Sequence, residues 1–183
     1  MATIDKEWIA RLTRPPMSRE AWEQALDEHA EFVRDAKPGW GSGFELLSVS
    51  GLPLAVWTGN PTELGKQINI GFADLRGLPL EWISLVAAAL PGVMAAGQSF
   101  RGSTLTYALM TDGCLDGADF SLVKAGDVDF SRSSLRGASF RGAMITDADF
   151  EGCDLTGADF RGATRLARVK LTDAILTDVL GLP

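Results

Sequence analysis

The side chains best suited to catalysis or metal binding are one histidine and two cysteines: His29, Cys114 and Cys153. A Ser–His–Asp hydrolase needs a serine beside its histidine, and nothing in the sequence places one beside His29. A zinc site of familiar spacing needs about four clustered His or Cys ligands, which these residues do not supply. Because His29 falls on the apolar stripe of a predicted helix, we interpret it as a packed histidine hydrogen-bonded to its surroundings.

The segment GNPTELGK, from Gly59 to Lys66, has the glycines and lysine of a phosphate-binding loop but not their spacing. Its two glycines are one residue too far apart, and Gln67 stands where Ser or Thr would hold a magnesium ion. The sequence therefore predicts no catalytic residues, no metal site and no cofactor.

The aspartates have a regular place in the sequence that suggests a structural role. Asp or Ser recurs immediately before an apolar residue that returns every five positions, as at Asp74, Ser99, Asp119, Asp129, Ser139, Asp149, Asp154 and Asp159. Side chains of these types accept hydrogen bonds from nearby backbone N–H groups in turns. We therefore predict turn caps rather than acid–base pairs.

This five-residue repeat is the dominant pattern of the chain. Every fifth residue from Ile70 to Phe160, which we call the centre of its unit, is apolar without exception. The residue two before the centre is usually small, and the residue two after it is often glycine, which supplies the positive φ of a tight turn. A period of five suits neither a helix nor a flat strand, whereas a fixed short period indicates a solenoid.

Four stretches carry the pattern most clearly: FADLRG (72–77), GADFS (117–121), GASFRGA (137–143) and DADFEGCDLTGADFRGA (147–163). They resemble the pentapeptide-repeat family, whose unit reads roughly A(D/N)LXX, and the resemblance extends over residues 66–160. It implies a β-solenoid, specifically a right-handed quadrilateral (four-sided) parallel β-helix with four units per coil. We expect it to carry an N-terminal α-helical cap.

Four units per coil place centres twenty residues apart on one wall, with adjacent coils about 4.8 Å apart. Phenylalanines are then confined to two walls, which supports the twenty-residue coil. Wall 1 stacks Leu80, Phe100, Phe120, Phe140 and Phe160; wall 2 stacks Ile70, Leu90, Met110, Phe130 and Phe150; wall 3 stacks Leu75, Ala95, Leu115, Leu135 and Leu155; wall 4 stacks Leu85, Leu105, Ala125 and Ile145.

Two stretches of the repeat are irregular. Residues 78–95 have the composition of a helix but keep the five-residue phase, so we favour a degenerate coil and keep a helix as the alternative. After Gly162 the phase slips, because Arg165 and Lys170 fall at buried positions where unpaired charges are rare. A one-residue bulge near Thr164–Arg165 makes Leu166, Leu171 and Leu176 the centres instead.

We divide the chain into three parts. Residues 1–39 form a helical cap, with a short helix at 4–13 and an amphipathic helix that Ser18 caps and Pro38-Gly39 ends. Its segment LDEHAEFV resembles the helix that precedes the coil in some members of the family. Residues 40–65 form an irregular first turn and loop, with 44–58 as a first, irregular wall set. Residues 66–183 form the β-helix, with a C-terminal cap from about residue 164.

Charge and composition exclude several classes of partner. The net charge is −7, which argues against ordinary nucleic-acid binding, and no apolar run is long enough for a membrane span. The N-terminal MATIDKEW lacks a signal-peptide pattern, so a bacterial cytoplasmic protein is expected, with export as a secretion-system effector as the alternative. Cys114 and Cys153 fall on wall 3 two coils apart, about 10 Å, so two free thiols are predicted.

Three groups of outward side chains are candidates for a partner surface. One is an acidic strip on one wall: Asp129, Asp149 and Glu151. A second is basic and lies on wall 1 beside Asp119 and Asp159: Arg101, Arg141 and Arg161. The third is apolar, and we expect the N-terminal helix to cover part of it: Trp82, Tyr107, Leu109, Leu122 and Met144.

A rigid solenoid without a catalytic constellation predicts a non-enzymatic scaffold that presents flat β walls to a protein partner. The family resemblance implies two alternatives: a DNA-mimic inhibitor or protector of a type II topoisomerase (DNA gyrase), or a secretion-linked effector or accessory protein. The apolar tail AILTDVLGLP would either cap the open end of the coil or pair with a second copy as a homodimer.

Overall fold

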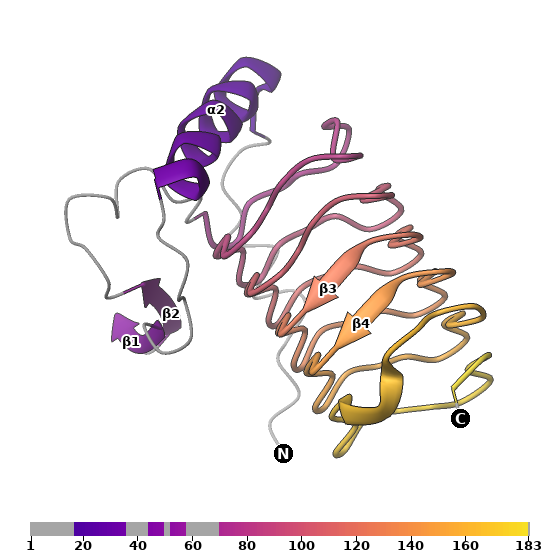
Figure 1. Cartoon of the computed structure of the whole chain (residues 1–183). Helices are drawn as coiled ribbons and strands as arrows, with labels where there is room; N and C mark the ends of the chain where they lie inside the picture. The colour runs from indigo at the N-terminus through magenta and orange to yellow at the C-terminus, as the bar shows by residue number, and fades with distance from the viewer. Residues whose placement is uncertain (1–16, 36–43, 50–51, 58–69, 183) are drawn as a thin grey trace.

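The fold is that of a computed structural model, which describes residues 17–35, 44–49, 52–57 and 70–182. Its regular elements are the helix α2 (Arg19–Asp35), the strands β1 (Phe44–Val49), β2 (Leu52–Trp57), β3 (Lys124–Gly126) and β4 (Met144–Thr146), and the 3-10 helix η1 (Leu166–Arg168). Most of the chain from residue 70 onward is a stack of coils (Figure 1).

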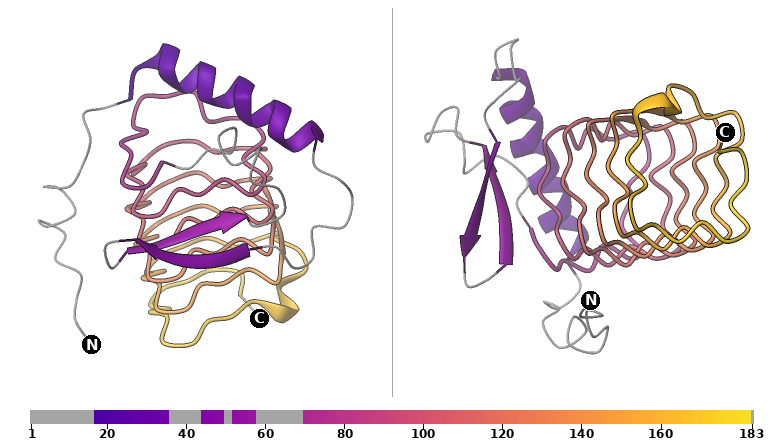
Figure 2. Two further views of the ribbon diagram at one scale, coloured as in Figure 1. Left: turned by 90° about the vertical axis from the view of Figure 1, so that its left-hand side faces the viewer. Right: turned by 90° about the horizontal axis from the view of Figure 1, so that it is seen from below.

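Parallel bridges between residues twenty apart define the coils. The residue just before each centre pairs with its equivalent in the next coil, as in Ser99↔Asp119 on wall 1 and Asp129↔Asp149 on wall 2. Strands β3 and β4 pair in the same way on wall 4. The chain passes wall 2, wall 3, wall 1 and wall 4 in turn, and Figure 2 shows the resulting tube. The predicted β-helix and its four walls are confirmed.

Each corner of the coil is a tight turn with a residue in the left-handed region. Two residues after every centre, from Phe72 to Gly162, φ is positive. Ten of these residues are glycine, and the other nine include Trp82 and Leu122. Interactions between coils therefore hold the turn even where a Cβ makes it unfavourable.

The core is a column of stacked side chains. On wall 1 the rings of Phe100, Phe120, Phe140 and Phe160 stack with centroids 4.7–5.1 Å apart and planes 7–9° from parallel. The wall 2 rings of Phe130 and Phe150 meet Phe140 edge-on, at 5.9 and 5.5 Å. All six rings are fully buried, so one aromatic cluster fills the tube.

The predicted one-residue slip is confirmed. Met144 pairs with Thr164 at the usual spacing of twenty, but Asp149 pairs with Lys170 at a spacing of twenty-one. The extra residue enters at the corner of Arg165 and η1, where Arg165 has φ 66°. Leu166, Leu171, Val169 and Ala174 then pack against the core, as the shifted phase predicts.

Two predictions on irregular segments had different outcomes. Residues 78–95 form a coil, as favoured over a helix. The prediction of a first wall set in residues 44–58 was wrong, because β1 and β2 pair antiparallel as a hairpin, with Phe44 opposite Trp57. Ser50 and Gly51 separate the two apolar runs, and a two-residue connection of this kind favours a hairpin over a coil. The predicted helix at 4–13 and the loop after residue 58 lie outside the described residues.

Helix α2 packs across the N-terminal end of the tube (Figure 1). Ser18 caps it as predicted, its Oγ accepting a hydrogen bond of 3.1 Å from the N–H of Ala21. Trp22 is fully buried, and its indole N–H donates to the carbonyl of Pro79 at 3.2 Å. His29 is also fully buried and hydrogen-bonds the backbone of Val86. It is therefore the packed histidine that its position on the apolar stripe predicts.

Replacing Phe140 tests how much the aromatic column stabilises the fold. Phe140→Ala removes a ring that contacts four others, and large-to-small changes of this type cost about 3–5 kcal/mol. The free energy of unfolding from urea titration measures the loss. Phe140→Leu keeps most of the apolar volume and should cost clearly less. A loss below about 1 kcal/mol for Phe140→Ala would contradict a close-packed column.

His29 should make the docking of α2 sensitive to mild acid. Burial lowers its pKa from the ordinary 6.5 to about 4, so the stability it contributes is fully present above pH 6.5 and is lost as the pH falls toward 4. Between pH 7 and pH 5 we expect a loss of about 2 kcal/mol. Urea unfolding and amide exchange in α2 across this range measure it. The neutral control His29→Gln should flatten the dependence; an equally steep profile in that variant would assign it to other groups.

Candidate functional site

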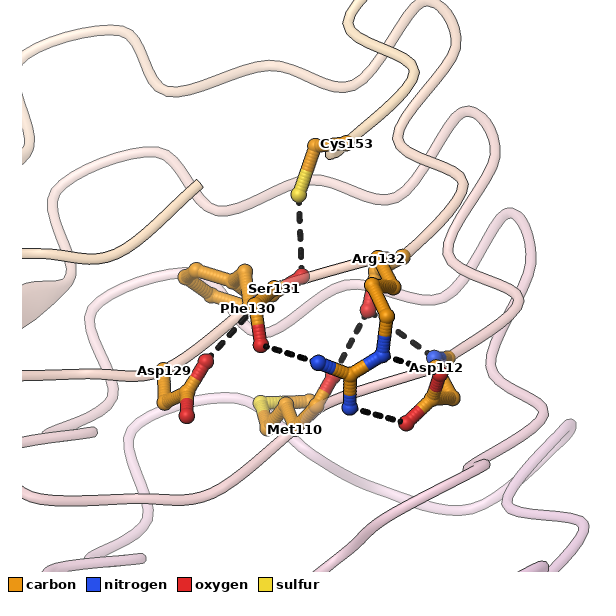
Figure 3. A network of polar contacts seen from close by, with 9 residues as sticks. Met110, Asp112, Asp129, Phe130, Ser131, Arg132 and Cys153 are labelled. Atoms are coloured by element: carbon orange, nitrogen blue, oxygen red, sulfur yellow. Dashed lines mark hydrogen bonds and ion pairs between the residues drawn. The ribbon is translucent and has the colours of Figure 1, made fainter. Parts of the chain in front are cut away.

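The side chains with the most reactive chemistry are part of the core. Cys153 is fully buried, and its Sγ donates to the carbonyl of Phe130 at 2.9 Å (Figure 3). Ser103 and Ser133 occupy equivalent inward positions and donate to the carbonyls of Leu80 and Met110 at 2.7 and 2.8 Å. Burial raises the pKa of Cys153 to about 12, which keeps it protonated and unreactive at neutral pH.

The described residues do not form a recognised metal or membrane site. Within the part of the chain that the structure describes, no group of three or more His, Cys, Asp or Glu is placed to hold a metal ion. Likewise, no helix in the described ranges is long and apolar enough to cross a membrane. Neither Cys114 nor Cys153 takes part in a disulfide, as predicted.

The aspartates before the centres bind the following turn, as predicted. In each case Oδ1 accepts a hydrogen bond from the backbone N–H two residues later, as from Asp119 to Ser121 at 2.8 Å and from Asp129 to Ser131 at 2.8 Å. Asp74 also forms a two-point ion pair with Arg76, whose guanidinium lowers the pKa of the carboxyl. These carboxylates therefore stabilise the turns of the β-helix.

The acidic strip of Asp129, Asp149 and Glu151 lies on wall 2 and its following corner, but it is partly neutralised. The slip brings Lys170 into register, and its Nζ lies 2.7 Å from Asp149 Oδ2. This contact raises the pKa of Lys170, so the ammonium group stays charged at neutral pH. Arg132 lies at the corner that follows Asp129 in the same coil, and its guanidinium pairs with Asp112 of the preceding coil at 2.8 Å (Figure 3).

The arginines of the basic group lie at the corner that follows wall 1. Asp159 accepts hydrogen bonds from Arg161 at 2.7 and 2.9 Å and from Arg141 at 3.0 Å. Arg161 in particular holds the pKa of Asp159 well below its usual range. The Asp159 carboxylate thus forms ion pairs with two arginines, and both arginine side chains remain more than half exposed.

The apolar group divides into exposed and covered members. Trp82, Leu122 and Met144 have exposed fractions of 67%, 44% and 42%. Tyr107 is half-buried, and Leu109, although at an outward position of the ladder, is only 9% exposed and offers little surface to a partner. Wall 2 itself packs around Leu109, whose neighbours in the ladder are Ala89 and Asp129. Helix α2 does not cover the three exposed side chains, because it packs on the end of the tube.

The structure brings the basic and apolar groups together at one corner. Arg101 and Arg141 directly precede Gly102 and Gly142, which lie in the same corner column as Trp82 and Leu122. The sequence predicts them as separate groups, although the spacing of forty residues between Trp82 and Leu122 already places both at one corner, two coils apart. Within the predicted apolar tail, the last coil exposes Ile175, Leu176 and Leu180, so the prediction of Leu176 as a buried centre was wrong.

Solved structures that resemble this chain are repeat proteins with varied biology. They include trypsin-treated QnrB1, a plasmid-mediated fluoroquinolone resistance protein (22% identity, 51% of this chain and 49% of that chain, TM-score 0.49). Others are the pentapeptide repeat protein Rfr23 from the cyanobacterium Cyanothece (18%, 54% and 63%, 0.43) and HetL from the cyanobacterium Nostoc, involved in heterocyst differentiation regulation (25%, 58% and 52%, 0.31). The chain spans about half of the length of the first of these structures. No curated protein matches it.

A model of the family described as pentapeptide repeats matches residues 126–162 in eight copies. The matched residues lie on all four walls and include the stacked rings of Phe130, Phe140, Phe150 and Phe160. Residues 126–162 of this chain are therefore pentapeptide repeats.

Proposed function

We propose that this protein is a non-enzymatic scaffold that binds a protein partner on the outside of its β-helix. The observation that carries the proposal is the concentration of exposed large apolar side chains on the tube at one corner, formed by Trp82, Leu122 and Met144. Exposed apolar patches on a soluble protein commonly mark protein interfaces. The column of buried rings beneath them makes the surface rigid, so little conformational entropy is lost on binding.

The use of the polar groups supports a binding role over catalysis. Cys153 is held in the core, His29 is buried under α2, and the aspartates before the centres cap their own turns. Catalysis commonly uses groups with perturbed pKa values that face a cleft, and here the two strongly perturbed neutral groups face the interior.

The DNA-mimic alternative depends on the acidic strip. A mimic of the phosphate backbone needs a strong negative field, which follows the unpaired charge on the surface. The pairing of Asp149 with Lys170 and of Asp112 with Arg132 counts against it. The strip remains the correct place to test this alternative.

A quantitative pull-down from a lysate of the native host tests the scaffold proposal. The baits are the wild type and the double variant Asp129→Lys and Asp149→Lys, which reverses the acidic strip. We expect one protein to be captured in similar amounts by both. A topoisomerase subunit captured by the wild type and lost in the variant would instead support the DNA mimic. If neither bait retains a partner in stoichiometric amounts, the scaffold proposal is contradicted.

We also propose that the protein forms a homodimer through its last coil. Ile175, Leu176 and Leu180 are 51%, 44% and 45% exposed there, although Leu176 occupies a core position. The same patch on a second copy would cover these side chains, as in an isologous twofold interface.

Sedimentation equilibrium at micromolar concentration tests the dimer. We expect about twice the chain mass of 19.6 kDa for the wild type and the monomer mass for the double variant Ile175→Glu and Leu180→Glu. The exposed control Thr172→Glu, on the same coil, should remain dimeric. A monomeric wild type would refute the proposal, as would an unchanged dimer in the double variant.

A further inference from the structure

The corner between walls 1 and 4 carries apolar anchors in a line along the tube. Trp82 and Leu122 occupy the same corner position two coils apart, and Met144 lies one coil further on the adjoining wall 4. At about 4.8 Å per coil, the first two anchors are about 10 Å apart. We call this corner, with its flanking residues on walls 1 and 4, the Trp82 edge.

Glycines in the next coil hold the two corner anchors in place. A Cβ built on Gly102 would lie 2.2 Å from the Trp82 ring, and one built on Gly142 would lie 2.9 Å from Leu122. The indole and the leucine therefore rest directly on glycine backbone while they remain exposed. By contrast, a Cβ on Gly97 or Gly117 would meet no atom within 4 Å. An exposed aromatic side chain that is already ordered is typical of a binding hot spot.

The backbone at the Trp82 edge is already used by the fold. The N–H groups of Trp82, Gly102 and Leu122 donate to carbonyls of the next coil at 2.9–3.0 Å. A partner therefore cannot add a strand here and must be recognised through side chains. Two anchors about 10 Å apart match residues i and i+7 of an α-helix, which rises 1.5 Å per residue.

Charge on the Trp82 edge is opposite in sign to that on the diagonally opposite corner. The edge carries four basic residues and three acidic ones: Arg101, Lys124, Arg141 and Arg161 against Glu81, Asp119 and Asp159. The opposite corner, between walls 2 and 3, carries seven acidic residues and, with the arginines that pair with Asp74 and Asp154, four basic ones: Asp74, Asp112, Asp129, Asp149, Asp154, Glu151 and Asp173 against Arg76, Arg132, Arg136 and Lys170. Complementary charge on a partner therefore has to be negative at the Trp82 edge.

We propose that the Trp82 edge binds an acidic amphipathic helix of a protein partner, laid along the tube. Its apolar stripe would cover Trp82, Leu122 and Met144, and its flanking carboxylates would face Arg101, Lys124 and Arg141. This inference rests on the scaffold function proposed above and specifies the surface and the chemistry of the partner.

Site-specific photo-crosslinking in the native host tests the inference. Benzoylphenylalanine is introduced in the full chain at Ser84, exposed on wall 4 beside Trp82, or at Glu151 on the opposite corner. Mass spectrometry then identifies the crosslinked peptide. We expect the Ser84 probe to capture an acidic segment with apolar residues at helical spacing, and the Glu151 probe to capture none.

Two pairs of variants, each combined with the Ser84 probe, test the roles of charge and of the ordered indole. The double variant Arg101→Glu and Lys124→Glu leaves the ion pairs of Asp159 in place and should reduce capture by on the order of tenfold. Reversal of the opposite corner by Glu151→Lys and Asp173→Lys should leave capture unchanged. Gly102→Ala should weaken capture by displacing the indole, whereas Gly97→Ala carries the same positive φ (69° and 71°) without the clash and should not.

The outcomes separate this inference from the scaffold proposal. Crosslinks from Glu151 alone would keep the scaffold and refute the Trp82 edge as its site. A crosslinked segment at Ser84 that is basic, or that belongs to a second copy of this chain, would refute the acidic helix. Equal capture by the charge-reversed edge would also refute it. Absence of crosslinks from both positions would overturn both proposals.

Discussion

The structure depends on backbone pairing between residues one coil apart. Each coil donates from and accepts into its neighbours at short, regular distances, such as the 2.8 Å bond from Phe100 N–H to the Asp119 carbonyl. This pairing keeps the walls in register: the coils repeat every twenty residues, the one extra residue is taken up at the Arg165 corner, and equivalent positions lie above one another. The stacked rings, the line of turns and the mixed-charge walls all follow from that constraint. Even strained corners, with Trp82 or Leu122 at positive φ, are held by it.

Much of the fold could be predicted because the pairing of coils requires particular residue types at fixed positions of each unit. The apolar centres gave the five-residue unit, the family resemblance implied four units per coil, and the two charges at Arg165 and Lys170 revealed the slip. The hairpin of β1 and β2 could not be separated from a wall set by spacing alone, since Phe44, Val49 and Leu54 also step by five. Antiparallel pairing depends on the two residues between the strands, which carry no five-residue signal.

The candidate surface was less predictable, for a physical reason. The sequence pattern decides which side chains point outward, but exposure depends on what neighbouring coils place beside them. Leu109 points outward and is nevertheless covered, whereas Trp82 is exposed and yet ordered because Gly102 lies beneath it. Likewise, Lys170 joins the acidic strip only because the slip moves it into register with Asp149. Surface character is thus a property of columns of residues twenty or twenty-one apart.

The extra residue at Arg165 shifts the five-residue register of every later unit by one. The backbone ladders of the walls continue beyond the extra residue, with Asp154 paired to Ile175 and Asp159 to Leu180. The centre of each later unit, however, lies one residue further along the sequence than the earlier phase predicts. The match to the family model ends at residue 162, just before that register changes. A solenoid can therefore continue for a coil beyond its uninterrupted repeat when a single residue is inserted at a corner.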